Sequence, residues 1–354
     1  MNSLVINETP VRTSKNFNIN DIKVNDIDLP SHFSKFENIS IINNDTKVKI
    51  DDLTSQISLD YGLGNRLTEL VKNNSNSKIN LIIDSKTNKD IFINYAFDKK
   101  CSVLLENIEI TANEGTKETI IVKYSSDNDV SAFHNGVIRV NAKQNSVLNI
   151  IIVNLLNEAS NNFLAIQNNF GAGAKVNYTI VDFGGKSSIT NYYSNMIGDL
   201  AKNTVNTIYL GRGSQVFDLN YIAELSGKEN NVKIEVQGAL ADNAKKHFKG
   251  TIDFKKGAKK SVGDENEACM LLSNTAKGIS LPMLLCSEED VEGNHSSSAG
   301  KIDEKELFYI MTRGFSLKEA MKLMVKARFN KILETISNED LKNEIISEID
   351  RRLD

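Results

Sequence analysis

The sequence is poor in residues that mark several protein classes, with three Cys, four His, three Pro and no Trp among 354 residues. The cysteines, Cys101, Cys269 and Cys286, form no C-x-x-C pair, which excludes a locally encoded zinc ribbon or redox dithiol. Their scarcity also argues against a disulfide framework and favours a reducing cytoplasm. With so few thiols the chain cannot bind an iron–sulfur cluster by itself through four nearby thiolates.

Long apolar runs and an excess of basic residues are absent too. No run reaches the ~20 residues of a membrane span, and the first residues, MNSLVINETPVRTSKN, lack the apolar core of a signal peptide. We therefore expect neither a membrane protein nor a secreted one. The net charge of −4 argues against a general nucleic-acid binder, which normally carries a basic excess.

The middle of the chain, from residue 78 to about 272, is instead rich in short β-type runs. Many alternate apolar and polar residues, which is the period of a strand with one buried face. The predicted strands cover residues 79–83, 91–95, 102–110, 119–124, 136–140, 147–153, 176–181, 204–210, 216–222, 232–236 and 248–254.

The turns between these runs repeat a small-residue corner. Residues 171–176 (GAGAKV) resemble 211–216 (GRGSQV), and 257–262 (GAKKSV) are a looser version. Sandwiches, barrels and solenoids all have many short strands, but the recurring corner and the lack of two-residue hairpin turns favour a β-solenoid. Asn, roughly one residue in eight, suits tight turns and stacked ladders.

The two ends of the chain lack the β-type pattern of the middle. Residues 1–77 are a short mixed region, with a helix predicted over 63–72 and a boundary loop at 71–77. Residues 301–354 are predicted to be helical because three successive helix-start signals occur, at Asp303, Ser316 and Ser337-Asn338. The expected organisation is thus a region 1–77, a β-solenoid core 78–300 and a C-terminal helical domain 301–354, whose apolar stripes pack on the solenoid end or serve a partner.

The stretch 281–303 is the strongest candidate for chemistry, and we predict that it is a hinge between solenoid and helices. It holds Cys286, four acidic residues and His295, followed by small residues that let backbone or another chain approach closely. The acidic residues, Glu288, Glu289, Asp290 and Glu292, could assist iron entry as hard-cation ligands or form a solvated loop.

Several short motifs resemble the SufB/SufD family of iron–sulfur cluster assembly proteins, most closely the SufD branch. They are HSSSAGKID at 295–303, LFY at 307–309, RG at 313–314, GTIDF at 250–254, LLS at 271–273 and PMLLC at 282–286. The resemblance implies a right-handed parallel β-helix core that pairs with a SufB-like paralogue. It also implies C-terminal helices that dock the SufC ATPase, in a complex that builds iron–sulfur clusters.

The resemblance makes His295 an interfacial histidine, a ligand for iron or for a transient cluster shared with the partner chain. Imidazole suits iron, and it completes sites otherwise made of thiolates. The alternative is a loop histidine bonded to backbone. Cys286 is a weaker candidate that we expect to be buried and inert, and Gly293 stands where some relatives carry Cys, against a Cys-x-His pair.

The remaining candidates are given structural roles. Cys269 is expected in the core, Cys101 has no assigned role, and His32, His134 and His247 are isolated. No phosphate loop is present, so we expect a non-catalytic scaffold whose ATP hydrolysis occurs on another chain. Two alternatives stay open: a SufB-like or homodimeric scaffold of the same system, and a carbohydrate-active β-helix enzyme, which the absence of Trp and of a signal peptide disfavours.

Overall fold

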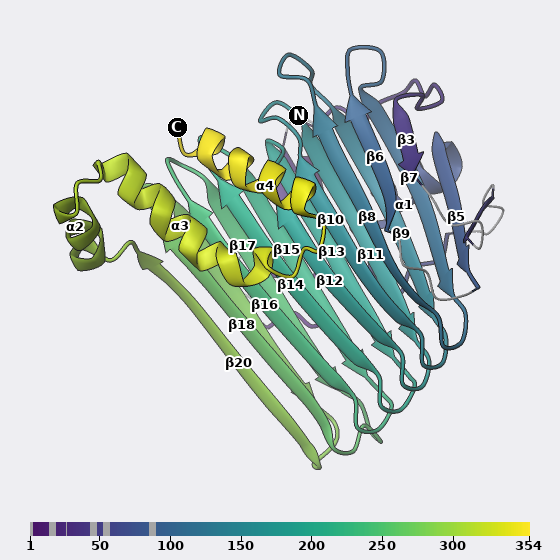
Figure 1. Ribbon diagram of the computed structural model, residues 1–354. Coiled ribbons are helices and arrows are strands. Elements are labelled where there is room, and N and C mark those ends of the chain that lie inside the picture. The colour runs from purple at the N-terminus through teal and green to yellow at the C-terminus, as the bar shows by residue number, and fades with distance from the viewer. Residues whose placement is uncertain (1–2, 14–18, 26, 43–47, 52–56, 85–89) are drawn as a thin grey trace.

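The computed structural model describes residues 3–13, 19–25, 27–42, 48–51, 57–84 and 90–354. The chain is mainly β and winds into a β-solenoid of about eight turns (Figure 1). Successive strands alternate between two nine-stranded sheets, so each coil adds one strand to each sheet. Within the series of strands from β5 to β20 every strand pair is parallel, which confirms the predicted parallel β-helix.

The first sheet has the order β20-β18-β16-β14-β12-β10-β8-β6-β3. Its strands are β3 (Ile39–Ile42), β6 (Ile91–Phe97), β8 (Lys117–Ser126), β10 (Val147–Leu155), β12 (Lys175–Asp182), β14 (Lys202–Gly211), β16 (Asn231–Leu240), β18 (Ser261–Leu271) and β20 (Val291–Lys301). The second sheet consists of β4 (Val48–Asp51), β5 (Ser77–Ile83), β7 (Val103–Ala112), β9 (Phe133–Ala142), β11 (Asn161–Phe170), β13 (Ser187–Met196), β15 (Val216–Leu225), β17 (Lys245–Phe254) and β19 (Lys277–Cys286).

Side chains that face inward form columns through the coils. Ile120, Ile150 and Tyr178 occupy one such column in neighbouring strands and are fully buried. On the outer face, Asn169 donates a side-chain hydrogen bond to the Oδ1 of Asn141, 28 residues earlier, as expected for an Asn ladder. Every coil thus buries its inner face on the next, which is what stabilises a solenoid.

The corners use the residues that the repeated motif predicts. Gly173 and Gly213 have φ angles of 66° and 58°, in the left-handed region that glycine adopts without steric cost. In the equivalent turn Asn145 takes φ 56°, a conformation that Asn tolerates better than most residues.

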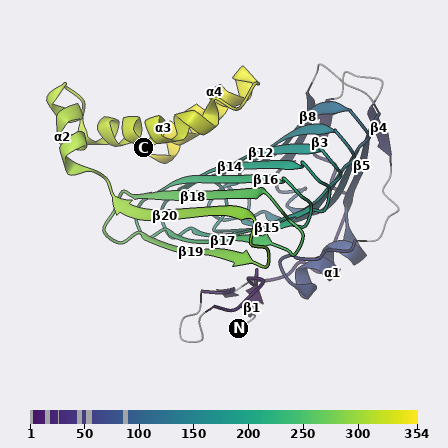
Figure 2. The ribbon, with the colours of Figure 1, turned by 90° about the horizontal axis from the view of Figure 1, so that it is seen from below.

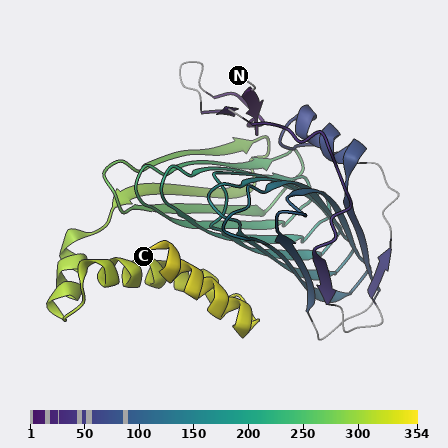
Figure 3. The same ribbon diagram turned by 90° about the horizontal axis from the view of Figure 1, so that it is seen from above.

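Both outer faces of the solenoid are partly covered (Figures 2 and 3). Helices α3 (Leu317–Leu333) and α4 (Glu339–Arg352) lie across the first sheet, where Phe329, Ile345 and other apolar residues pack on its outer side chains. The opposite face carries the hairpin β1 (Ser3–Ile6) and β2 (Ile22–Asn25) and the helix α1 (Asn65–Asn74). The C-terminal helices therefore pack along a sheet rather than on the solenoid end.

The predicted helices are confirmed. Helix α2 (Glu304–Thr312) is capped by the Asp303 side chain, which accepts bonds from the Lys305 and Glu306 amides. Helix α3 begins with the predicted capping box of Ser316 and Glu319, and α4 is capped by Asn338. The helix predicted over 63–72 is α1, which begins two residues later. Part of the predicted region 1–77 lies outside the described residues.

Two predictions about the strands are wrong. The predicted strands omit β11, in which a continuous apolar run at 163–166 is flanked by Asn, and β13, in which Ser, Thr and Asn lie between the apolar residues. The stretch 281–303 is not a hinge, because most of it forms the end of β19 and the whole of β20, the last coil of the solenoid. Its small residues sit in a strand because the ladder with β18 holds them there.

Candidate functional site at the open end of the solenoid

His295 lies in the middle of β20, the last strand of the first sheet. β20 pairs with β18 on one side only, and from Glu292 onward its residues are exposed. The backbone groups along its other edge therefore have no neighbouring strand in the described part of the chain. His295 makes no hydrogen bond or ion pair with any described residue.

The side chain of His295 belongs to the inner face of the strand. Two residues further on, the Ser297 hydroxyl donates to Glu267 Oε2 at 2.9 Å, while Ser296 bonds to Asn266 on the other face. Because side chains alternate along a strand, His295 points to the same side as Ser297. It thus stands in the last layer of inward-facing side chains, at the open end of the solenoid.

The buried carboxyl group of Glu265 lies next to His295, on the adjacent strand β18. Glu265 is the register partner of His295 in β18 and is 1% exposed, yet neither of its carboxylate oxygens has a hydrogen-bond partner among the described residues. Its space exists because Gly250 of β17 has no side chain: a Cβ there would lie 2.0 Å from Glu265 Oε2. Burial, reinforced by the nearby Glu267, raises the pKa of Glu265 to about 8.

The neighbouring carboxylate, Glu267, is fully satisfied. The Lys246 ammonium lies 2.7 Å from its Oε1, and the hydroxyls of Ser280 and Ser297 each donate to Oε2 at 2.9 Å. The Tyr209 hydroxyl adds a bond at 3.1 Å. The inner layer at this end of the solenoid therefore holds two acidic groups that differ in their bonding. Glu267 has partners for both oxygens, and Glu265 has none among the described residues.

The structure does not bring the two sequence-predicted ligands together. Cys286 ends β19 and is exposed, so the prediction that it is buried is wrong. Gly293 faces Leu284 across the last coil, with 3.3 Å from a Cβ built on it to Leu284 Cδ1. His295 lies two residues after Gly293, and Cys286 lies two residues after Leu284. Because β19 and β20 run in opposite directions, the two side chains are four residues apart along the strands, or about 13 Å.

The other two cysteines lie in or beside the core, as predicted for Cys269. Cys269 is buried in the core, and burial raises the pKa of its thiol. Cys101 is half-buried against the same core, and its amide donates to Asp98 Oδ1 at 2.7 Å.

The acidic residues before His295 form no ligand cluster. Glu288 accepts the amide of Gly257 at 2.9 Å and lies buried in the turn, where this bond lowers its pKa. Glu289 and Glu292 are exposed. Within the described ranges no group of three or more His, Cys, Asp and Glu side chains is placed to hold a metal ion.

The chain is similar in sequence to proteins of one known family. The family model described as "SUF system FeS cluster assembly, SufBD core domain" matches residues 95–328, from β6 to within α3, and this span includes His295 and Glu265. The chain belongs to this family.

Among curated relatives, this SufBD-core protein is 25% identical over 261 residues to the iron–sulfur cluster assembly protein SufD of Bacillus subtilis (strain 168), covering 73% of this chain and 60% of the relative. It is 23% identical over 240 residues to SufD of Escherichia coli (strain K12), with 68% and 57% covered. A SufBD family protein of Pyrococcus horikoshii is 26% identical over 234 residues, with 65% and 50% covered. The aligned part is thus 60% or less of each of these relatives.

Sequence reasoning missed the buried polar residues of this SufBD-core protein. Glu265, Glu267 and Cys269 alternate along β18 and share its inner face, so their period of two was the available signal. His134, assigned a structural or surface role, is fully buried, with its Nδ1 2.6 Å from Asn162 Oδ1 and its Nε2 3.6 Å from Glu106 Oε1.

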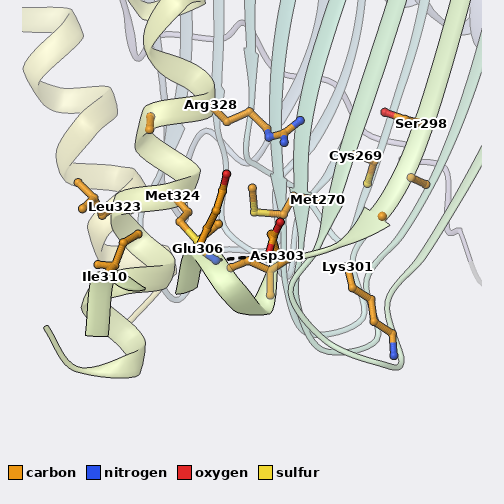
Figure 4. Close-up of a pocket in the computed structure, with 14 residues that line it drawn as sticks. Cys269, Met270, Ser298, Lys301, Asp303, Glu306, Ile310, Leu323, Met324 and Arg328 are labelled. Atoms are coloured by element: carbon orange, nitrogen blue, oxygen red, sulfur yellow. Dashed lines mark hydrogen bonds between the residues drawn. The ribbon is translucent and has the colours of Figure 1, made fainter. Parts of the chain in front are cut away.

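A second surface feature of this SufBD-core protein lies where the helices leave the solenoid (Figure 4). A pocket of about 610 Å³ opens between the ends of β18 and β20 and the helices α2 and α3, lined by Met270, Met324 and Arg328 among others. Beside it, α2 and the start of α3 expose large apolar side chains, which we call the α2–α3 apolar patch. Its residues are Phe308, Tyr309, Met311, Phe315, Leu317 and Leu323. None of the helices described here has the length and apolarity of a membrane span.

Proposed function

We propose that this chain is a SufD-like, non-catalytic subunit of an iron–sulfur cluster assembly scaffold in the cytoplasm. It pairs with a SufB-like chain at the open end of its solenoid and docks a SufC-like ATPase through its C-terminal helices. His295 contributes a ligand to iron or to the cluster under assembly, which is the cargo of the complex. The observation that carries the proposal is an exposed histidine, without a partner among the described residues, on the terminal strand of a SufBD core, which pairs along one edge only.

The open strand edges support pairing with a second chain. β19 and β20 each have one neighbour in their sheet, and soluble proteins rarely leave such an edge uncovered. A strand from another chain would satisfy these backbone groups and would bring that chain's side chains next to His295.

The α2–α3 apolar patch supports docking of a helical or ATPase partner. Phe308 is 68% exposed and Tyr309 58%, although both stand on a helix whose Leu307 is buried. Exposed apolar residues gathered on neighbouring elements mark interaction surfaces.

The role of His295 is tested by cluster assembly in the anaerobically reconstituted complex with SufB-like and SufC-like partners. His295→Ala should slow the rise of the cluster's visible absorption by about tenfold or more, since even the loss of a group that only orients a metal ligand costs about 10–100-fold. Asn294→Ala, on the opposite face of the same strand, is the matched control and should assemble clusters at the wild-type rate. A wild-type rate for His295→Ala would falsify the assignment.

The docking surface is tested separately by co-purification with the SufC-like ATPase. Phe308→Asp places a charge in the α2–α3 apolar patch and should abolish capture of the ATPase while the solenoid stays folded. Glu304→Gln, an exposed change on the same helix, should leave capture intact. Retention of the ATPase by Phe308→Asp would exclude the patch as its docking site.

A further inference from the structure

Glu265 is a buried carboxyl group of β18 whose two oxygens have no bonding partner among the described residues. A buried acidic group normally finds hydrogen bonds or a cation, because desolvation without compensation is costly. Both oxygens of Glu265 lack a partner, whereas Glu267, two residues away, is bonded by a lysine and three hydroxyls. The carboxylate oxygens of Glu265 are therefore available to a cation or a hydrogen-bond donor.

The position of this carboxylate relative to His295 defines what it can bind. The two residues are register partners on adjacent parallel strands and point to the same face, so their backbones lie about 4.8 Å apart. Gly250 keeps the opposite strand from filling the space around the carboxylate. Glu265 thus lies one layer below the imidazole, on the inner side of the open end.

The combination of an imidazole nitrogen and a carboxylate oxygen is suited to divalent iron. We propose that Glu265 and His295 together form a two-ligand site for a divalent iron ion, in which the Glu265 carboxylate is the second ligand supplied by this chain. The inference rests on the proposed function, since it assumes that His295 handles iron. Water or side chains of the partner at the open edge would complete the coordination.

Cobalt(II) is the probe for this site, since it occupies iron(II) sites and its visible absorption reports the ligands. In anaerobic titrations of the full-length chain, we expect one Co²⁺ per chain with absorption bands that change in His295→Ala. Glu265→Gln keeps the size of the side chain but is a far poorer metal ligand, and should weaken Co²⁺ binding by about tenfold or more. Asp264→Asn makes the same change one residue away, on the outer face of β18, and should bind as wild type.

The outcomes separate the inference from the function on which it rests. If Glu265→Gln binds Co²⁺ as wild type while His295→Ala does not, the carboxylate is no ligand and His295 keeps its proposed role. If neither substitution affects binding, or wild type binds no Co²⁺, the two-ligand site is rejected and the cluster-assembly assay alone judges His295. Thermal melts of Glu265→Gln show whether it folds. If Glu265→Gln is unfolded, Glu265→Asp replaces it. Glu265→Asp should bind Co²⁺ more weakly than wild type and more tightly than His295→Ala, and any other order of affinities would contradict the two-ligand site.

Discussion

At the scale of single residues, the inside of the solenoid combines apolar columns with a few ionised groups. Lys246 and Glu267 form an ion pair in which both side chains are fully buried. Removing two charges from water is expensive, so such a pair persists only when every remaining donor and acceptor is bonded. The hydroxyls of Ser280, Ser297 and Tyr209 meet that requirement here.

Lys246→Met should leave Glu267 as an uncompensated buried charge and lower the free energy of unfolding by about 3–5 kcal/mol. The double substitution Lys246→Met with Glu267→Leu should recover most of this loss, because it removes both charges. Lys72→Met, in the exposed pair with Glu69, is the control and should change stability by less than about 1 kcal/mol. Urea unfolding measures all three, and a double variant no better than the single one would contradict the explanation.

Asp182 offers a test of pH dependence at the same scale. Burial raises its pKa from 3.8 to about 6, although bonds from Ser188 and Asn154 and the charge of Arg352 oppose the shift. The folded chain therefore holds this proton more tightly than the unfolded chain. Its contribution to stability is complete below pH 3.8 and is lost as the pH rises through 6.

Between pH 4 and pH 7, the stability of wild type relative to Asp182→Asn should fall by an amount on the order of 3 kcal/mol, since each pKa unit corresponds to about 1.4 kcal/mol. Urea titrations of both proteins at the two pH values give this difference, in which contributions from other carboxylates cancel. A difference that is constant with pH would mean that Asp182 keeps an ordinary pKa in the folded state.

At the scale of elements, local chemistry decides where the helices begin. The Ser316 hydroxyl accepts the Glu319 amide, and the Glu319 carboxylate accepts the Ser316 amide at 2.7 Å. Such pairs are encoded within four residues, so the starts of α2, α3 and α4 were predictable from sequence. The strands β11, β13 and β20 were not predicted. The polar residues of β13 and the small residues of β20 are held in strands by the register of their neighbours.

Ser316→Ala should therefore loosen the first turn of α3 without unfolding the solenoid. The loss of the cap costs about 1 kcal/mol, which corresponds to about fivefold faster hydrogen exchange of the Glu319 amide. Ser347→Ala on the exposed surface of α4 serves as the comparison and should leave exchange in α3 unchanged. Unaltered exchange at Glu319 in Ser316→Ala would show that packing, not the cap, holds this turn.

At the scale of the whole molecule, the solenoid has a closed and an open end. The antiparallel strands β3 and β4 cover the edges of the first coil, whereas β20 has no strand along one side in the described part of the chain. The repeating corners made the solenoid itself predictable, and the family motifs pointed to His295. The pairing of His295 with Glu265 was not predictable, because it depends on a register between residues that a whole coil separates.

Ala299→Pro tests whether this edge is an interface. The Ile302 amide donates to Leu271 of β18, and because donors alternate along a strand, the Ala299 amide faces the free edge. Proline there removes a donor to an incoming strand but none to β18, and edge strands tolerate it. We expect Ala299→Pro to lose association with a SufB-like chain, or with itself, in light-scattering chromatography, while Ala299→Ser retains it. Equal association of the two variants would place the interface elsewhere.

The helices that lie across the first sheet also impose an order of events. Apolar residues of α3 and α4 form one cluster with outward side chains of the first sheet that run from Ile121 of β8 to Met270 of β18, so the two helices cover several successive coils. A ribosome makes α3 and α4 after all of these strands. The growing chain therefore carries Ile208, Leu210 and Ala239 uncovered until the helices emerge, and they are buried only when the helices close over them. During synthesis this apolar strip is exposed surface of the kind that makes incompletely folded chains prone to aggregation, and the closing helices remove it.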